Sequence, residues 1–300
     1  MHAKTEICDA IVIGAGPAGL TAATYLGRFR RQCLVLEDGH SRARWIPTSH
    51  NIPGFTAGIG GTEFLATLKV QSMQYGAQIR RAHVTAITMD ESVFVVTLDA
   101  QESLCSRYLL LATGVKDHLP ALPGVSEAVL RSLMRFCPIC DAFEAIDRRI
   151  AVIGNGIVGE REAEFLTTYS KEVTLLHLGE SESKPRAREF KVRGIEWIPI
   201  ELDDLLIEKD HLTLRANTAD ERRFDVAYLA LGCSAQHRLA KDLGAACDSQ
   251  GALIVNGHQE TSVPRLYAAG DLVRGLNQVI VAAAEGAIAA TDIHNKLRGA

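Results

Sequence analysis

The pattern of apolar and polar positions along the chain predicts short buried strands that alternate with longer helices. An apolar run of strand length covers residues 8–13, and a glycine-rich turn at 14–19 leads into Ala-rich helical sequence through about Arg30. Residues 33–37 then form a second apolar run. A strand, a glycine turn, a helix and a second strand make up the unit from which a doubly wound parallel sheet is built.

The same unit occurs again in the middle of the chain. An apolar run at 149–153 leads into a second glycine turn at 154–159, a helix to about Ser170 and a strand at 173–177. Further strands are predicted at about 84–89, 93–98 and 108–111, and the Pro/Gly-rich stretch 119–124 is a plausible crossover. Near the end, a strand at about 266–269 runs into a turn, and an Ala-rich helix spans 279 to about 297. The repetition predicts two related α/β nucleotide-binding domains.

Composition agrees with two domains and narrows the class of protein. The chain has 300 residues, of which 47% are hydrophobic and 23% charged, as in an ordinary globular protein. Its net charge of -4 gives no general electrostatic reason to bind nucleic acid, and we expect the Arg30-Arg31 and Arg80-Arg81 pairs to be solvated. No apolar run is long enough for a transmembrane helix, and residues 1–6 lack a signal-peptide core. We therefore expect a cytoplasmic protein with no membrane partner.

The cysteines point to a reducing compartment and to one special pair. Five of the seven are scattered among apolar or mixed segments, as buried free thiols are in a reducing compartment: Cys8, Cys33, Cys105, Cys233 and Cys247. Only Cys137 and Cys140 stand close together.

The first glycine turn has the spacing of a dinucleotide site. Gly14 permits a tight turn, Gly16 lets backbone amides approach a pyrophosphate, and Gly19 allows the helix to pack on the strand. Glu37, about twenty residues on, ends the second strand, where its carboxylate can accept hydrogen bonds from a ribose diol. The alternative is an ordinary strand-to-helix turn, which the correctly placed acid disfavours.

The second glycine turn, with Gly154, Gly156 and Gly159, is less complete. The position equivalent to Glu37 is His177, where an acid would suit an unmodified ribose and arginine a 2′-phosphate. The nearest charged candidates lie further along, at Glu180, Arg186 and Arg188. The residues leave open whether this second nucleotide site is occupied or empty.

Cys137, Cys140 and Asp141 are the candidate catalytic residues. Helix-compatible sequence follows the pair, so Cys140 would lie close to a helix N-terminus that favours the thiolate, and the three-residue offset suits disulfide closure across one turn. The alternatives are half a zinc site or two inert core thiols, but no second C-x-x-C or paired His ligands occur at a suitable spacing, so no metal is expected. Asp141, if partly buried, could protonate a leaving thiolate or a reduced flavin position, or it could simply cap the helix.

These motifs, taken in order, resemble the low-molecular-weight thioredoxin reductase family over nearly the whole chain. The resemblance rests on both glycine turns and on four further segments, namely residues 137–141, 267–271, 111–115 and 277–279. It implies an α/β fold of two Rossmann-like, doubly wound, three-layer domains, with the second inserted into the first. The FAD-binding domain would comprise 1–116 and 245–300, and the NAD(P)H-like domain with the dithiol would comprise 117–244.

The resemblance also implies roles for individual residues. Cys140 would contact the flavin ring, Cys137 would attack the disulfide of a partner, and Asp141 would be the general acid. Asp271 would bind the ribitol region, Gln278 and Val279 would border the flavin ring, and Asn51 would lie in the flavin loop. Trp45 would stack near the flavin or be a partly buried packing aromatic. The remaining candidate FAD-binding residues are Ala15, Pro17, Ala18, Asp38, Val84, Ala112, Thr113, Gly114, Gly270 and Asn277.

The chain departs from the family where NADPH-using members carry a histidine followed by two arginines. Here His177 is followed by Leu178, Gly179 and Glu180, so the usual 2′-phosphate clamp is missing. The segment at 44–51 also differs from the usual flavin loop and resembles divergent relatives with another electron donor. We therefore expect FAD as cofactor, regard NADPH as doubtful, and keep ferredoxin or another donor open.

Three functions remain after this comparison. The first is a reductase that passes electrons from FAD to the Cys137–Cys140 disulfide and on to thioredoxin or a similar protein, with a homodimer expected from the family. The second is a dithiol oxidase that forms a disulfide in a small molecule, with oxygen as acceptor. The third is a non-catalytic flavin redox sensor.

Overall fold

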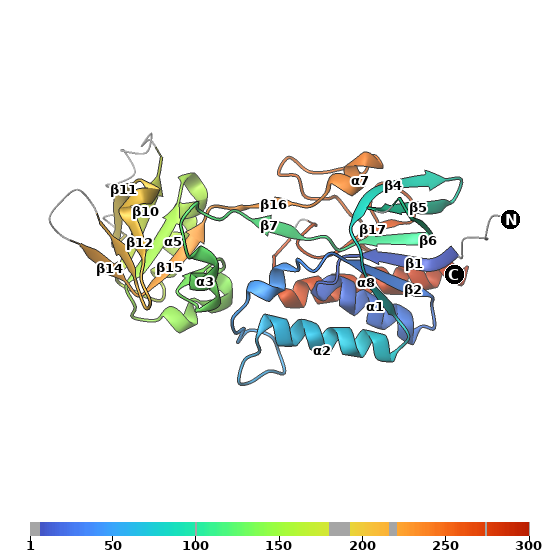
Figure 1. The fold of residues 1–300 in the computed structure, drawn as a ribbon, viewed down its shortest axis with the longest axis horizontal. Helices are drawn as coiled ribbons and strands as arrows, with labels where there is room; N and C mark the ends of the chain where they lie inside the picture. The colour runs from blue at the N-terminus through green and yellow to red at the C-terminus, as the bar shows by residue number, and fades with distance from the viewer. Residues whose placement is uncertain (1–6, 100, 180–192, 216–220, 274, 300) are drawn as a thin grey trace. The chain divides into compact units, whose positions relative to one another are not determined.

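The computed structural model describes residues 7–99, 101–179, 193–215, 221–273 and 275–299, which form two compact units (Figure 1). The first unit contains Met1–Arg44, Gly60–Lys116 and Ala235–Ala300, and the second contains Trp45–Ile59 and Asp117–Ser234. Most of the second unit is therefore one insertion in the sequence of the first.

These units differ from the expected domain limits in two places. Residues 235–244 belong to the first unit, because Leu239 and Ala240 of α7 (Arg238–Asp242) are buried in one of its hydrophobic clusters. Residues 45–59 group with the second unit. The chain crosses between the units in β7 (Val115–Asp117) and again at β16 (Cys233–Ala235), which pair with each other. The Pro/Gly-rich stretch 119–124 lies beyond this crossing and is not the crossover that the sequence suggested.

The first unit is built on a seven-stranded sheet. In the order β3-β2-β1-β6-β5-β4, with β17 also paired to β6, its strands are Gln78–Arg81, Cys33–Glu37, Ile7–Ile13, Ser103–Leu111, Val93–Leu98, Val84–Asp90 and Leu266–Ala268. The strands β1, β2, β3, β6 and β17 are parallel, and β5 and β4 extend the sheet antiparallel to β6.

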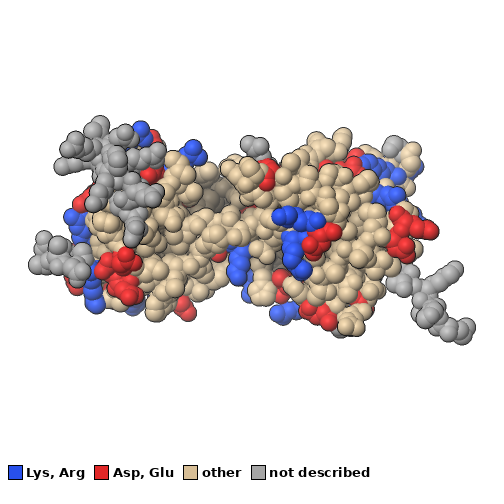
Figure 2. Space-filling model, turned by 90° about the horizontal axis from the view of Figure 1, so that it is seen from above, with Lys and Arg blue, Asp and Glu red and all other residues tan. Residues whose placement is uncertain are grey.

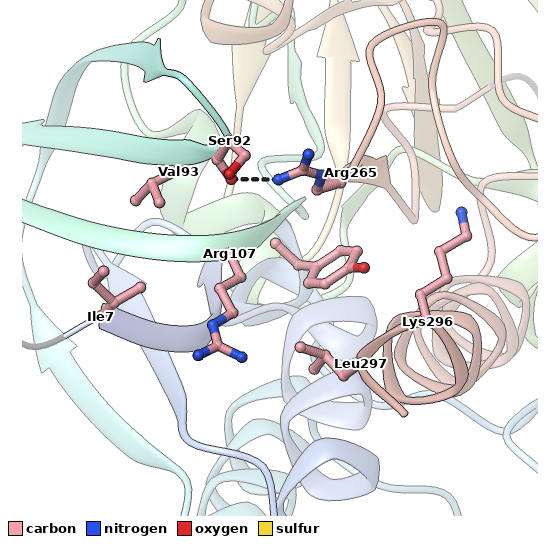
Figure 3. A pocket seen from close by; sticks show the side chains of 8 residues that line it. Ile7, Ser92, Val93, Arg107, Arg265, Lys296 and Leu297 are labelled. Atoms are coloured by element: carbon pink, nitrogen blue, oxygen red, sulfur yellow. Dashed lines mark hydrogen bonds between the residues drawn. The ribbon is translucent and has the colours of Figure 1, made fainter. Parts of the chain in front are cut away.

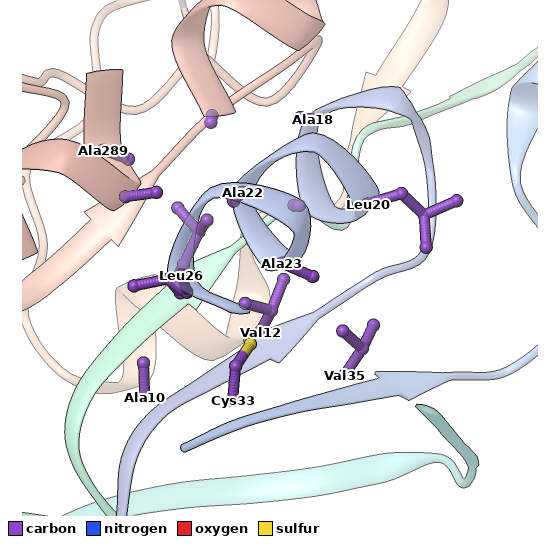
Figure 4. Close-up of a cluster of buried hydrophobic side chains, with 14 of the residues drawn as sticks. Ala10, Val12, Ala18, Leu20, Ala22, Ala23, Leu26, Cys33, Val35 and Ala289 are labelled. Carbon is purple, nitrogen blue, oxygen red and sulfur yellow. The ribbon is translucent and has the colours of Figure 1, made fainter. Parts of the chain in front are cut away.

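Both faces of this sheet are buried, as the continuous apolar runs of its central strands predict. Three helices, α1 (Pro17–Arg28), α2 (Gly61–Gln74) and α8 (Val279–Leu297), lie on one side in Figure 1, and α1 packs against both α2 and α8. Val12 and Val35 lie under α1 in Figure 4, and Ala289 of α8 joins the same cluster. Ile11 and Ile13 belong to a second cluster on the opposite face.

The second unit is built on a five-stranded parallel sheet in the order β11-β10-β9-β15-β8. Its strands are Ile195–Ile200, Val173–Leu178, Ile150–Gly154, Val226–Ala230 and Met134–Arg135. The helix α5 (Gly156–Leu166) contributes to the cluster on one face, whereas α3 (Val125–Leu130) and a small antiparallel sheet contribute to the cluster on the other. That sheet consists of β12 (Leu205–Ile207), β13 (Leu212–Leu214) and β14 (Arg222–Phe224).

Short helical turns complete the described chain. They are α4 (Pro138–Asp141) and the 3-10 turns η1 (Arg42–Trp45), η2 (Phe143–Ala145) and η3 (Leu202–Asp204). On the face in Figure 2, acidic and basic side chains are interspersed. No helix in the described ranges is long and apolar enough to cross a membrane. The fold is α/β with two Rossmann-like units, as the sequence predicted.

Candidate functional site

The first unit gathers the predicted flavin residues at the carboxyl ends of its parallel strands. The register pairs Ile13 with Leu111 and Leu111 with Ala268, so β1, β6 and β17 end at one edge of the sheet. Beyond that edge, the Ala112 amide donates to the Ile13 carbonyl (2.8 Å), and the Ala269 amide donates to the Leu111 carbonyl (3.0 Å). The glycine turn, the 112–114 turn and the 270–271 turn are thereby neighbours. This edge is where parallel α/β sheets bind nucleotides.

Backbone packing explains the first glycine turn. Gly14 has a φ of +109°, and a Cβ on it would overlap the carbonyl of Ala112. A Cβ on Gly19 would overlap the Gly14 carbonyl, so helix and strand touch directly. Gly16 is the N-cap of α1, with Pro17 next, and its added Cβ would find no atom closer than Ser41 Oγ at 3.5 Å. The helix thus begins with open space beside its free amides, which fits a pyrophosphate.

Glu37 lies at the end of β2, one residue beyond the pair of Leu36 with Ile13. Its Oε1 accepts a hydrogen bond from the Lys69 ammonium of α2. The chain returns to Glu37 after β3, where the Ala82 amide donates a hydrogen bond to the Glu37 carbonyl (2.9 Å). Val84, two residues further along the chain, is buried. Asp38 is exposed and accepts from the His40 amide at 3.0 Å. The carboxylate of Glu37 is therefore anchored at the strand edge, as a ribose contact requires.

Two charged residues that the sequence reading missed hold the turn after β17. Arg42 Nη1 lies 2.8 Å from Asp271 Oδ2, and Glu285 Oε2 accepts a hydrogen bond from the Gly270 amide at 2.7 Å. Burial, followed by the nearby charge of Asp271, raises the pKa of Glu285. The one signal for Glu285 is that it is the single acid in the otherwise apolar first half of α8.

The α8 helix begins at Gln278 and Val279, the two residues predicted to border the flavin ring. Gln278 is its N-cap and is 9% exposed, and its Nε2 donates to the Asn277 carbonyl at 3.1 Å. Val279 is the first helical residue. The helices α1 and α8 pack against each other in the first unit, so both belong to the same helical layer of that unit.

Cys137 and Cys140 form a disulfide in the structure, with their Cα atoms 5.3 Å apart. Cys137 is the N-cap of α4, and the Cys140 amide donates to its carbonyl at 2.9 Å. The longer helix expected after the pair does not form, and α4 ends at Asp141. The Asp141 carbonyl accepts from Arg135 Nη1 (2.6 Å) and from the Tyr228 hydroxyl (3.2 Å), so side chains occupy the acceptor that a further helical turn would use.

The carboxyl of Asp141 belongs to the same network. The Tyr228 hydroxyl donates to Oδ1 at 3.0 Å, and Arg135 Nη1 lies 3.8 Å from Oδ1. Burial is the largest influence and raises the pKa of Asp141 to about 6, whereas Arg135 and Tyr228 act to lower it and Glu144 to raise it. A carboxyl of this kind can exchange a proton near neutral pH, which a simple helix cap does not require.

Trp45 and Asn51 are grouped with the second unit and are not among the residues that the first sheet brings together. Trp45 is partly buried and packs against the cluster that contains Val125 and Leu133. Asn51 Oδ1 accepts from the Ser49 hydroxyl at 2.8 Å.

The second glycine turn also joins a strand to a helix, but its backbone differs from that of the first, because the left-handed glycine is Gly156 and the N-cap is Asn155. Gly154 ends β9 and lies in register with His177 of β10, and Gly159 packs on Gly154. Gly156 has a φ of +52° and opens α5. His177 is 5% exposed, its ring lies 5.4 Å from that of Trp197, and its Nδ1 has no hydrogen-bond partner. Glu180, Arg186 and Arg188 lie outside the described residues.

A surface pocket of about 310 Å³ lies at the opposite end of the first sheet. Ile7 lines it, so the seven residues of β1 place it roughly 20 Å from the glycine turn. The cationic side chains that line it do not converge on one point in Figure 3. Arg265 points toward Ser92, whereas Arg107 and Lys296 point away from Arg265 and from each other. Lys296 is neutralised by Glu260 (2.7 Å) and Asp292 (3.1 Å). The pocket is therefore separate from the candidate site.

Known proteins that resemble this chain show the class of enzyme to which it belongs. The profile of the pyridine nucleotide-disulphide oxidoreductases matches residues 8–286. A thioredoxin reductase of Mycolicibacterium smegmatis is 31% identical over 97% of this chain and 97% of its own. One of Treponema pallidum (strain Nichols) is 29% identical over 94% of each chain.

Solved structures agree in fold. The crystal structure of HlmI superposes with a TM-score of 0.89 at 27% identity, covering 98% of this chain and 93% of that one. A putative thioredoxin reductase from Bacillus anthracis superposes with a TM-score of 0.88 at 25% identity, covering 97% and 99%. The chain belongs to the low-molecular-weight thioredoxin reductase family and is an FAD-dependent disulfide oxidoreductase.

Proposed function

We propose that this protein passes electrons from FAD to the Cys137–Cys140 disulfide and then to thioredoxin or a similar protein disulfide. The observation that carries the proposal is the disulfide itself, formed directly before a partly buried carboxyl whose pKa is about 6. The names of the relatives support thioredoxin as the partner. The family resemblance supports a homodimer, which sedimentation of the purified protein would test.

The residues at the first sheet edge fit FAD and would hold it. The α1 amides beside Gly16 would bind the pyrophosphate, Glu37 the ribose and Asp271 the ribitol region. Once its electron donor has reduced it, bound FAD would supply the two electrons that open the Cys137–Cys140 disulfide.

The dithiol would then act by two exchange steps. The Cys137 thiolate attacks one sulfur of the partner disulfide, forming a mixed disulfide and releasing one partner thiolate. The Cys140 thiolate attacks Cys137 Sγ, which restores the protein disulfide and releases the second thiolate. Asp141 supplies a proton at this dithiol. Ile139, between the two cysteines, and Phe143, three residues after Cys140, are 53% and 72% exposed and offer apolar surface to a protein partner.

Dithiothreitol can test the dithiol chemistry without knowledge of the natural donor. Mixed anaerobically with the yellow holoenzyme, it should reduce the disulfide and then bleach the flavin. In the Cys137→Ser and Cys140→Ser variants, dithiothreitol should bleach little or none of the flavin, although the flavin stays bound. The matched control is Cys247→Ser, a half-buried cysteine outside the disulfide, which should behave as wild type. Full-rate bleaching in both active-site variants would refute the proposal.

For the donor, we propose that NADPH is not the ordinary reductant. The His177 ring beside Gly154 supports this, because it is 5% exposed and packs on Trp197, which leaves it little surface for contact with a 2′-phosphate. Anaerobic stopped-flow absorbance with NADPH and with NADH should show no rapid bleaching, whereas dithionite should bleach the flavin normally. Rapid bleaching by NADPH would overturn the donor proposal alone. Hydrogen peroxide release on adding dithiols in air would instead favour the oxidase direction.

A further inference from the structure

Two strands of the second sheet place a buried arginine and a buried tyrosine against the segment that carries the disulfide. Tyr228 of β15 is in parallel register with Arg135 of β8, so their side chains are neighbours. Only Phe136 separates Arg135 from Cys137 along the chain. The register of β8 and β15 thus decides which side chains meet the end of α4.

Arg135 and Tyr228 hold Asp141 at its backbone and its carboxyl together. The Tyr228 hydroxyl donates to Oδ1 (3.0 Å) and approaches the carbonyl (3.2 Å), and Arg135 Nη1 donates to the same carbonyl (2.6 Å). Tyr228 is fully buried, the Arg135 side chain is 10% exposed, and Arg135 Nε donates to the Ser132 carbonyl at 3.1 Å. Water competes little for these bonds, so the carboxyl has a defined position.

We propose that Arg135 and Tyr228 are positioning residues that hold the Asp141 carboxyl for proton transfer at the Cys137–Cys140 dithiol. This inference rests on the proposed function, in which the dithiol is the redox centre. It assigns the placement of the Asp141 carboxyl to two residues that lie outside the C-x-x-C motif.

When two electrons from reduced FAD, or from dithiothreitol in the test below, break the Cys137–Cys140 bond, two thiolates form, and one of them takes the proton of Asp141. The new carboxylate is stabilised by the Tyr228 hydroxyl and by the guanidinium of Arg135. When the disulfide closes again, the two electrons pass to the partner disulfide, or to the flavin in the dithiothreitol reaction, and a thiol returns its proton to the carboxylate.

Charges around Asp141 determine when the carboxyl can do this. Burial raises its pKa, Arg135 from β8 and Tyr228 from β15 oppose that rise, and Glu144 from η2 adds to it. Without Arg135 or Tyr228, the carboxyl would keep its proton to a higher pH, since a nearby cation or donor favours the ionised form. A protonated Asp141 cannot accept the thiol proton, so flavin reduction by a dithiol would slow at low pH.

The test uses the holoenzyme with two independent readouts. The first is an infrared titration of the protonated carboxyl band that Asp141→Asn removes. The second is the pH dependence of anaerobic flavin bleaching by dithiothreitol, taken as the ratio to wild type at each pH so that the ionisation of the reagent cancels. Tyr228→Phe removes one hydroxyl and keeps the buried ring. Arg135→Met removes the charge, and Arg135→Lys retains it.

In Tyr228→Phe and Arg135→Met, the Asp141 titration should move upward by about one pH unit. Bleaching should then be roughly fivefold slower at pH 6 and near the wild-type rate at pH 8. Arg135→Lys should recover part of the shift. The control is Arg149→Gln, which breaks an ion pair with Asp225 (2.5 Å) in the same unit, and it should leave the titration unchanged.

An unchanged Asp141 titration in Tyr228→Phe would overturn the inference, even if turnover fell equally at every pH, because that loss would be purely structural. The proposed function would still stand in that case, provided that Cys137→Ser and Cys140→Ser abolish bleaching. If those cysteine variants bleach at full rate, the proposed function fails first and takes this inference with it.

Discussion

The hydroxyl of Tyr228 donates a hydrogen bond to Oδ1 of Asp141 at 3.0 Å, although the two residues are 87 positions apart in the chain. The contact exists because β15 pairs with β8, whose last residue, Arg135, lies close before the disulfide. It couples the candidate redox centre to the interior of the second sheet. Other buried or charged residues of both units give further predictions.

Gly14→Ala should produce a protein without bound flavin. The substitution forces a Cβ into the Ala112 carbonyl at a φ of +109°, so the turn that carries the predicted pyrophosphate contact must move. We expect a loss of roughly 2–4 kcal/mol in stability, together with loss of the flavin absorbance. Gly257→Ala is the control, because its Cβ would meet no atom within 4 Å. Wild-type flavin content in Gly14→Ala would contradict this reading of the turn.

Arg42→Met should weaken flavin binding about tenfold, which corresponds to roughly 1.4 kcal/mol. Arg42 Nη1 lies 2.8 Å from Asp271 Oδ2, and without it the carboxylate loses a charged partner at the strand edge. Fluorescence titration of the apoprotein with FAD measures the change. Arg44→Met, two residues along, removes an exposed arginine that bonds only the Gly39 carbonyl among its described contacts and should bind FAD like wild type. Equal affinities for both variants would argue against a role for Arg42.

Glu162→Gln should stabilise the second unit at neutral pH. Burial raises the pKa of Glu162 to about 7, and its Oε2 has no hydrogen-bond partner. Between about pH 4.5 and 7 the unfolded chain loses this proton while the folded unit retains it, so wild-type stability falls as pH rises through that window. The variant lacks this fall, and above pH 7 it should be more stable by roughly 1–3 kcal/mol.

Tryptophan fluorescence reports this transition, because both tryptophans, Trp45 and Trp197, belong to the second unit. The control is Glu164→Gln on the same helix, where the carboxylate is exposed and paired with Arg193 at 2.5 Å. It should show the pH dependence of wild type. A Glu162→Gln protein that loses stability in parallel with wild type from pH 4.5 to 7 would contradict the assignment.

Local pattern was sufficient for much of the fold. The apolar runs at 33–37 and 93–98 are strands with those limits, and the Ala-rich stretch from Val279 ends at Leu297 as predicted. Both glycine turns follow strands and precede helices, as their spacing requires. Such features depend on neighbours within a few residues, so the sequence carries them directly.

The limits of helices and domains were harder to predict, because contacts distant in sequence decide them. The short α4 ends where Arg135 and Tyr228 bind the Asp141 carbonyl, although the residues that follow are compatible with a helix. Residues 235–244 join the first unit because Leu239 and Ala240 are buried there. Arg42 and Lys69 contact predicted flavin residues, yet nothing in their local sequence distinguishes them from solvated charges.

The sequence by itself determined that Gly14, Glu37, Cys137 and Cys140 are candidates for nucleotide and disulfide chemistry, since a turn, a strand end and a three-residue cysteine offset are local properties. Tertiary structure alone decided what surrounds them. Strand register brought Arg135 and Tyr228 to Asp141, and helix packing brought Glu285 to the Gly270 amide. The physical reason is that burial and charge, which set the pKa of a carboxyl, depend on neighbours in space and not on neighbours in the chain.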